Sequence, residues 1–333
     1  MIAPMVIRQS DLSSFSYCAM RQRYDHGMIA NNLSHKLPRL SATIYGTVLH
    51  ACLEFMQRGV NEGKPDMYEQ ALAKFQHLWH PERIHELPGV PGWPNVWVKK
   101  TNSGMYSSFA AQTLAAAHGW MEGRIESGEV LLGTELQFDL PYEVDGVTHT
   151  LHGTIDRLSL VFGSGKTKPP MLIVGDWKTG KKPTYLQYAM QWTIYSWAST
   201  QPAFWENFRG IPAFNDVLAA LYARGFSLFG ESEHPLVPRR GLWLSAQDGG
   251  FSESDCGFRG DQHFARMRLA IKNYVEARVG GFAPLTMDNE KCNFCVYNGQ
   301  DPLVAEDPDV PVCGDAPLPV FQEGVEPWEQ WVK

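Results

Sequence analysis

Hydrophobic residues recur every three to four positions along much of the N-terminal half of the chain, which is the spacing of amphipathic helices. The pattern predicts helices over residues 10–25, 42–58, 67–78 and 105–126. The segment 81–104 between the last two is rich in proline, tryptophan and glycine and fits neither a helix nor a strand. We therefore expect a helical N-terminal region that contains one long loop.

From residue 135 onward the period of the pattern changes from that of helices to that of strands. Apolar and polar residues alternate over 135–140, Asp145-Gly146 is a strong signal for a two-residue hairpin turn, and 148–160 fits the returning strand. Further on, the pattern predicts strands over 171–178, 217–222 and 241–245 and helices over 184–200 and 258–279. This order predicts an α/β protein in which helices flank a central mixed sheet.

The composition is that of an ordinary globular protein, with 333 residues, 44% of them hydrophobic and 20% charged. We expect one domain with a helical part (10–130), a core (131–230) and a C-terminal part (231–333). The formal net charge of -7 argues against binding nucleic acid by bulk electrostatics, although a nuclease needs only a local basic track. No apolar run approaches the ~20 residues of a membrane span, and residues 1–10 lack a secretory signal, so an intracellular (cytoplasmic) location without membrane contact is expected.

The apolar run that begins at Met171 ends in Asp176-Trp177-Lys178. Side chains alternate along a strand, so Asp176 and Lys178 share one face and Trp177 points to the other. A carboxylate beside an ammonium can hold a divalent cation and polarise a water or a phosphate oxygen. The alternative is a solvated ion pair at the end of a strand.

Two further residues strengthen the metal interpretation. If the strand over 148–160 pairs with that over 171–178, Asp156 lies beside Asp176, and two converging carboxylates are costly unless a cation separates them. His50, on a predicted helix, could add a nitrogen ligand. The alternatives are an Asp156-Arg157 pair that faces water and a histidine that packs in the core.

Together these motifs resemble a known family, the RecB-like exonuclease branch of the PD-(D/E)XK nuclease superfamily. In that branch a Gly-x-x-x-His helix, a strand glutamate, a Gly-x-x-Asp-Arg strand, an Asp-x-Lys strand and a Gln-x-x-x-Tyr helix follow in this order. Here the same order is formed by Gly46 to His50, Glu135, Gly153 to Arg157, Asp176 to Lys178, and Gln191 to Tyr195. Each element is short, but five in the right order are specific. The resemblance implies a restriction-endonuclease-like fold.

The resemblance also implies roles for individual residues. The metal ligands would be His50, Asp156, Asp176 and the backbone carbonyl of Trp177, and Lys178 would orient the attacking water or stabilise charge on the phosphate. Hard oxygen ligands of this kind suit Mg²⁺ or Mn²⁺.

Six more residues receive less definite roles. Glu135 would help to hold a second metal or a water. Gln191 and Tyr195 would position Lys178 or contact the nucleic acid, with core packing as the alternative for Tyr195. Lys181, Lys182 and Arg157 are expected to contact DNA phosphates.

Four cysteines have the spacing of metal ligands: Cys18, Cys292, Cys295 and Cys313. Four thiolates bind either a structural zinc or an iron-sulfur cluster, and the residues alone do not separate the two. The resemblance implies a [4Fe-4S] cluster that joins the N- and C-terminal segments, as in CRISPR-associated adaptation nucleases and the AddB nuclease domain. The long gap before Cys313 departs from the family pattern. Cys52 is expected to be a small buried apolar residue.

The function implied is a Mg²⁺- or Mn²⁺-dependent deoxyribonuclease, an exonuclease that acts on single-stranded DNA or DNA ends. The alternative is a non-catalytic DNA-binding or assembly module that keeps the fold and the cluster. The chain lacks the Gly-x-x-x-x-Gly-Lys-Ser/Thr phosphate loop of an ATP motor, so a helicase or a recombination or adaptation protein would be a separate partner.

Overall fold

The structure is a computed structural model, in which the fold is described for residues 3–17, 41–80, 83, 100–163, 169–179, 190–230, 234–247 and 249–280. Within these ranges the N-terminal elements are β1 (Val6–Arg8), α1 (Gln9–Tyr17), α3 (Ser41–Asn61), α4 (Met67–Leu78) and α5 (Lys100–Glu126). The sheet continues with β2 (Glu129–Val144), β3 (Val147–Val161), β4 (Met171–Lys178), β5 (Arg239–Ser245) and β6 (Ser252–Arg259). The remaining helices are α6 (Met190–Ala198), α7 (Pro202–Trp205), η4 (Glu206–Phe208), α8 (Pro212–Tyr222) and α9 (Asp261–Gly280).

The centre of the fold is a six-stranded mixed sheet with the order β1-β3-β4-β5-β6, in which β2 also pairs with β3. The β2, β3 and β4 strands form an antiparallel meander, β4 and β5 are parallel, and β5 and β6 are antiparallel. The mixed sheet predicted from the sequence is confirmed. It extends beyond the expected core range 131–230, because β5 and β6 come from the C-terminal part of the chain.

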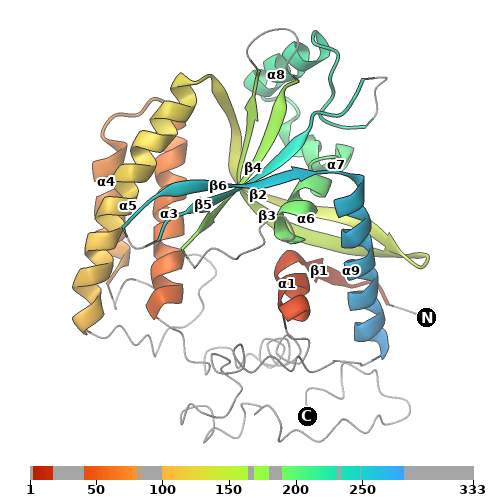
Figure 1. Ribbon diagram of the computed structural model, residues 1–333, viewed down its shortest axis with the longest axis horizontal. Coiled ribbons are helices and arrows are strands. Elements are labelled where there is room, and N and C mark those ends of the chain that lie inside the picture. Colours follow the sequence, from red (N-terminus) through yellow and green to blue (C-terminus); the bar gives the residue numbers. More distant parts are fainter. Residues whose placement is uncertain are drawn as a thin grey trace, which may run out of the picture.

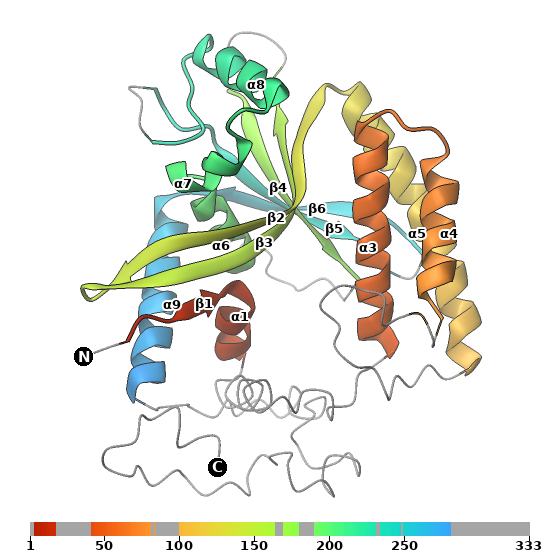
Figure 2. The same cartoon turned by 180° about the vertical axis from the view of Figure 1, so that it is seen from behind.

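Helices cover both faces of the sheet, as Figures 1 and 2 show. The α3, α4 and α5 helices pack on one face, and α6 to α9 pack on the other. The strand β4 contributes to both cores, because Ile173 and Trp177 belong to the first and Leu172 and Val174 to the second. A strand buried on both faces reads as a continuous apolar run, which is how β4 appears in the sequence.

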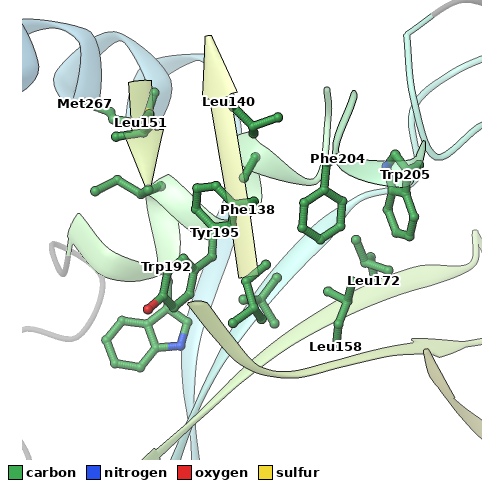
Figure 3. Packing of buried hydrophobic residues seen from close by; sticks show 14 of the residues in the cluster. Phe138, Leu140, Leu151, Leu158, Leu172, Trp192, Tyr195, Phe204, Trp205 and Met267 are labelled. Carbon is green, nitrogen blue, oxygen red and sulfur yellow. The ribbon is translucent and has the colours of Figure 1, made fainter. Parts of the chain in front are cut away.

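Aromatic packing attaches α6 to the sheet (Figure 3). The ring of Phe138 on β2 meets Tyr195 at 6.2 Å and Phe204 at 6.1 Å, both in edge-to-face contact. Trp192 donates a hydrogen bond from its indole nitrogen to the carbonyl of Leu242 on β5 (3.1 Å). These contacts fix the start of α6 near the end of β4, where the candidate site lies.

Several local predictions are confirmed. The helix at residues 67–78 and the strand at 171–178 have the expected bounds. Asp145 and Gly146 both have positive φ angles, 48° and 79°, as the two-residue turn of a β-hairpin requires. The helix expected from residue 184 is present from Met190, and residues 184–189 lie outside the described part of the chain.

The prediction of a strand over 217–222 is wrong, because this stretch is the second half of α8. Phe214, Val217 and Leu221 are buried at helical spacing, and Pro212 provides the first residue of the helix. The six residues 217–222, taken alone, are compatible with either a strand or a helix. The helical period becomes visible only when the pattern is followed back to Pro212.

Two strands were not predicted from the sequence. The strand β1 has only three residues, too few to show a period, and it pairs in parallel with β3. The strand β6 occupies Ser252–Arg259, so the last helix begins at Asp261 and not at residue 258. Its exposed side chains give β6 little apolar alternation.

His149 on β3 offers a test of this packing. The residue is 1% exposed, its Nδ1 accepts the N–H of Met5 (3.3 Å), and within the described residues its buried Nε2 has no hydrogen-bond partner. Burial lowers the pKa of His149 below that of an exposed histidine, so the folded protein binds fewer protons there than the unfolded chain. Its contribution to stability is therefore present above pH ~6.5 and is lost as the pH falls below that value.

We expect the free energy of unfolding to fall less between pH 7.5 and 5 in His149→Gln than in the wild type, because glutamine does not titrate. Urea unfolding followed by tryptophan fluorescence at several pH values measures this difference. An identical loss of stability in both proteins would contradict the role assigned to His149.

Candidate active site

The pairing of β3 with β4 brings the two predicted aspartates together. Arg157 pairs with Gly175, so the next position in the same antiparallel register places Asp156 opposite Asp176. Asp176 is fully buried, Asp156 is 7% exposed, and Asp156 accepts the backbone N–H of Trp177 (2.8 Å). Burial and the neighbouring Asp176 raise the pKa of Asp156 well above its usual range. The site therefore holds two close carboxylates in a place where negative charge is costly.

His50 reaches this pair from α3. Its Nε2 lies 2.6 Å from the backbone carbonyl oxygen of Trp177, to which it donates in the tautomer protonated there, and 3.5 Å from Asp156 Oδ2. Burial lowers the pKa of His50, so the ring is neutral at physiological pH. Moving the ring proton to Nδ1 would leave Nε2 as a nitrogen donor beside two oxygen donors.

Gly46 explains how α3 comes so close to the strand end. A Cβ atom at this position would lie 2.6 Å from the hydroxyl oxygen of Thr179, just beyond β4. A side chain here would have to displace this hydroxyl at the contact between α3 and the end of β4, one helical turn before His50. The glycine of the Gly-x-x-x-His element thus permits the close approach.

Glu135 completes the cluster in an unusual backbone conformation. Its φ angle is +50°, in the left-handed region, which a residue with a Cβ rarely adopts. The ladder between β2 and β3 skips this position, and the carboxylate lies 4.0 Å from His50 Nδ1. Burial, reinforced by nearby Glu54, raises the pKa of Glu135 to about 7. A strained residue that turns an acid toward other acids is typical of a functional site.

Gln191 and Tyr195 lie beside Asp176, and Gln191 is linked to Lys178 through this aspartate. Gln191 Nε2 donates to Asp176 Oδ1 (2.7 Å) and lies 3.0 Å from the hydroxyl oxygen of Tyr195. The ammonium of Lys178 forms an ion pair with the other oxygen of Asp176. Asp176 is therefore held between Gln191 on α6 and Lys178. Tyr195 contacts Gln191 through its hydroxyl group and packs its ring in the core.

The donor set fits a divalent cation. Ligand atoms of His50, Glu135 and Asp156 all lie within 4.8 Å of one another, and the carbonyl of Trp177 is next to the histidine nitrogen. One neutral nitrogen with several hard oxygens suits Mg²⁺ or Mn²⁺. A cation would also relieve the repulsion between the buried carboxylates. Glu135, which the sequence left with a secondary role, belongs to this closest group, whereas Asp176 adjoins it through Asp156.

Arg157 lies in the interior and not on a DNA-binding surface. Its side chain is 2% exposed, forms an ion pair with Glu129 (2.6 Å), donates to Gln57 on α3 (3.0 Å), and lies over the ring of Trp120 (5.0 Å). This placement does not suit a phosphate contact. Arg157 faces away from Asp156, its sequence neighbour, and ties the helix that carries His50 to the strand that carries Asp156.

The other predicted contacts lie outside the described residues: Lys181, Lys182, Cys18, Cys292, Cys295 and Cys313. Cys52 on α3 is fully buried in the core, as expected for a small apolar residue, and burial raises the pKa of its thiol to about 12. Among the described helices, none has the length and apolar character that a membrane span requires.

The family model of the PD-(D/E)XK nuclease superfamily matches residues 8–300, so the chain belongs to this superfamily. Membership, together with the acidic cluster at the end of β4, indicates a metal-dependent nuclease. A search of curated proteins gives no match. Among solved structures, the crystal structure of SSO0001 is 12% identical over 61% of this chain and 79% of that one, with a TM-score of 0.27, which is too low to carry an argument.

The buried position of Arg157 predicts a large effect on stability. Arg157→Met leaves the buried Glu129 with Arg124 (3.2 Å) as a cationic partner and removes the donor to the buried Gln57 and Ser159, so we expect the free energy of unfolding to fall by about 1–3 kcal/mol. Arg240→Met is the matched control, because Arg240 pairs with Asp255 at the surface, where loss of an ion pair costs about 0–1 kcal/mol. Urea unfolding of both variants tests the difference. Equal, small losses would show that the Arg157 pair does not hold the core together.

Proposed function

We propose that this chain is a Mg²⁺- or Mn²⁺-dependent DNA exonuclease that hydrolyses phosphodiester bonds in single-stranded DNA or at DNA ends. The observation that carries the proposal is the convergence of His50, Glu135 and Asp156 with the carbonyl of Trp177, next to the ion pair of Asp176 and Lys178. The exonuclease activity and the DNA substrate are supported by the order of the five sequence motifs.

In this proposal His50, Glu135, Asp156 and the Trp177 carbonyl hold the cation. When bound, the cation supplies a Lewis acid that polarises a phosphate oxygen and lowers the pKa of a water. Lys178 acts directly on the substrate and the water, whereas Asp176 and Gln191 act through Lys178. Lys178 presents an ammonium, held by Asp176, that stabilises the negative charge growing on the phosphate and orients the attacking water.

Gln191 gives Asp176 its fixed orientation from the opposite side. Because Asp176 accepts from Gln191 and pairs with Lys178, the ammonium is held in place before substrate arrives. A preorganised charge of this kind needs no rearrangement during the reaction, which is why it lowers the barrier more than a mobile one.

The runner-up is a non-catalytic DNA-binding or assembly module with the same fold. The pairing of buried acids with Lys178 argues against it, because such a costly cluster has no use in a module that only binds. A separate helicase or recombination or adaptation partner and an intracellular location belong to the same proposal and rest on the sequence alone.

The catalytic proposal is tested with end-labelled single-stranded DNA and Mn²⁺. We expect Lys178→Met and Asp176→Asn to lose at least ~100-fold in cleavage rate, as for loss of a preorganised charge. Lys272→Met is the control, because Lys272 forms an exposed ion pair with Asp145 (2.9 Å). A closed circular single strand should resist the wild type.

Equal cleavage by all four proteins would reveal a contaminating nuclease. A wild type that binds DNA but releases no product would favour the binding module. Rapid cleavage of the closed circular strand would show that the protein is an endonuclease and not an exonuclease.

We also propose that Cys18, Cys292, Cys295 and Cys313 bind a [4Fe-4S] cluster, with structural Zn²⁺ as the alternative. What supports a shared site is the packing of the two described elements that lead to these cysteines. Cys18 follows directly on α1, and α9 precedes the C-terminal segment. Phe15 on α1 contacts Tyr274 on α9 edge to face at 5.4 Å, and both helices end on the same side of the molecule (Figure 2).

The cluster proposal predicts a brown protein with broad absorbance near roughly 400 nm. Iron and sulfide analysis should give about four of each per chain in anaerobically purified protein. Cys18→Ala should lose the colour, whereas Cys52→Ala, which replaces a buried thiol in the core, should keep it. A colourless protein with one zinc per chain would support the zinc alternative and rule out the cluster.

A further inference from the structure

A polar stripe runs along α3 away from the candidate active site. His50, Glu54 and Arg58 are each four residues apart and so share one face of the helix. The rise of an α-helix places Arg58 about 12 Å from His50 along its axis. Opposite the stripe is β2, where Arg58 donates to the hydroxyl of Thr134 (2.9 Å), the residue before Glu135. The stripe thus connects the active site to a second location between α3 and β2.

An open cavity of about 250 Å³ lies at that second location. It forms where β2 has a bulge: Leu131 pairs with Ser159 and Gly133 with Leu158, so Leu132 is an extra residue in the ladder. Bulges bend a strand and are frequent beside active sites. The lining combines the end of α3 with this bulge: Arg58, Asn61, Glu62, Leu131, Leu132, Gly133 and Thr134.

The chemistry of the lining suits one nucleotide. The side chain of Arg58 is 55% exposed, and its ion pair with Glu54 and its bond to Thr134 hold the guanidinium in place. A fixed guanidinium is a good partner for a phosphate. Asn61 offers an amide that can hydrogen-bond a base, and Leu131 and Leu132 offer an apolar wall. The other charged group of the lining, Glu62, pairs with Lys64 (2.5 Å).

We infer that this cavity is a subsite for a single nucleotide of the substrate strand, with Arg58 on its phosphate, next to the nucleotide that is cleaved. The inference rests on the proposed nuclease function and deepens it by locating where the substrate strand is held. The cavity is open to the surface, and its volume of about 250 Å³ lies near the lower end of the range of ligand pockets, about 300–1,000 Å³, so it suits a ligand no larger than one nucleotide. A base that enters this subsite must be unpaired, so the inference predicts that a single strand or a frayed end binds better than an intact duplex.

The test measures binding of fluorescein-labelled dT12 by anisotropy. EDTA is present throughout, so that binding is separated from cleavage and from metal binding at nearby Glu135. We expect Arg58→Gln to weaken binding by roughly three- to tenfold and to lower the slope of log affinity against log salt by about one, as for loss of one phosphate contact. Asn61→Asp, on the exposed end of α3, adds a negative charge beside the phosphate and should weaken binding similarly.

Arg209→Gln is the matched control. Arg209 forms a helical ion pair with Glu206 (2.7 Å), as Arg58 does with Glu54, and it is 72% exposed. It does not line the cavity, and the variant should bind dT12 as the wild type does. A relaxed, covalently closed circular DNA duplex, which has neither ends nor unpaired loops, should bind equally well to wild type and Arg58→Gln.

The outcomes separate the subsite from the proposed function. If Arg58→Gln and Asn61→Asp bind dT12 as well as Arg209→Gln does, the subsite is wrong, whatever the cleavage assay shows. If Arg58→Gln loses the same affinity for the closed duplex, Arg58 is a general DNA contact and the single-nucleotide assignment fails. If the wild type cleaves nothing but the Arg58 effect on dT12 appears, the subsite stands and the catalytic proposal falls.

Discussion

The antiparallel pairing of β3 with β4 places the carboxylates of Asp156 and Asp176 opposite each other in the interior of the protein. Two buried negative charges repel each other and lack the solvation of water, so one of them keeps its proton unless a positive charge is near. The raised pKa values of Asp156 and Glu135 express this cost. Lys178 supplies one compensating charge, and a cation held by the ligand atoms of His50, Glu135 and Asp156 would supply a second.

The rest of the fold keeps the elements around this pair in place. Gly46 allows α3 to approach the end of β4, and the guanidinium of Arg157 ties that helix to β2 and β3 through Glu129 and Gln57. On the other face of the sheet, α6 reaches Asp176 through Gln191. The candidate metal ligands therefore come from one helix and three strands, and no two of them are neighbours in sequence: His50, Glu135, Asp156 and the carbonyl of Trp177. This rigidity is what a site for a small, hard cation requires.

Local patterns predicted much of this arrangement. The apolar run before Asp176 identified β4. The two-residue period placed Asp176 and Lys178 on the face opposite Trp177, which agrees with the burial of Trp177 in the core of α3 to α5 and with the Asp176–Lys178 ion pair on the side of α6. What the pattern could not reveal depends on contacts distant in sequence. The burial of Arg157 is set by its partner Glu129, and the left-handed backbone of Glu135 is held by the surrounding sheet. Neither leaves a periodic signal, and a three-residue strand such as β1 leaves none either.

The central claim is that the acidic cluster is built to hold a cation, and thermal unfolding in EDTA and in Mn²⁺ tests it most directly. In EDTA, Asp156→Asn should unfold roughly 2–4 °C above the wild type, because it removes a buried like charge and keeps an oxygen for the N–H of Trp177. Mn²⁺ should stabilise the wild type but not this variant. Asp139→Asn, an exposed change on β2, should respond as the wild type does. An Asp156→Asn protein that is less stable than the wild type in EDTA and still gains as much from Mn²⁺ would contradict the account.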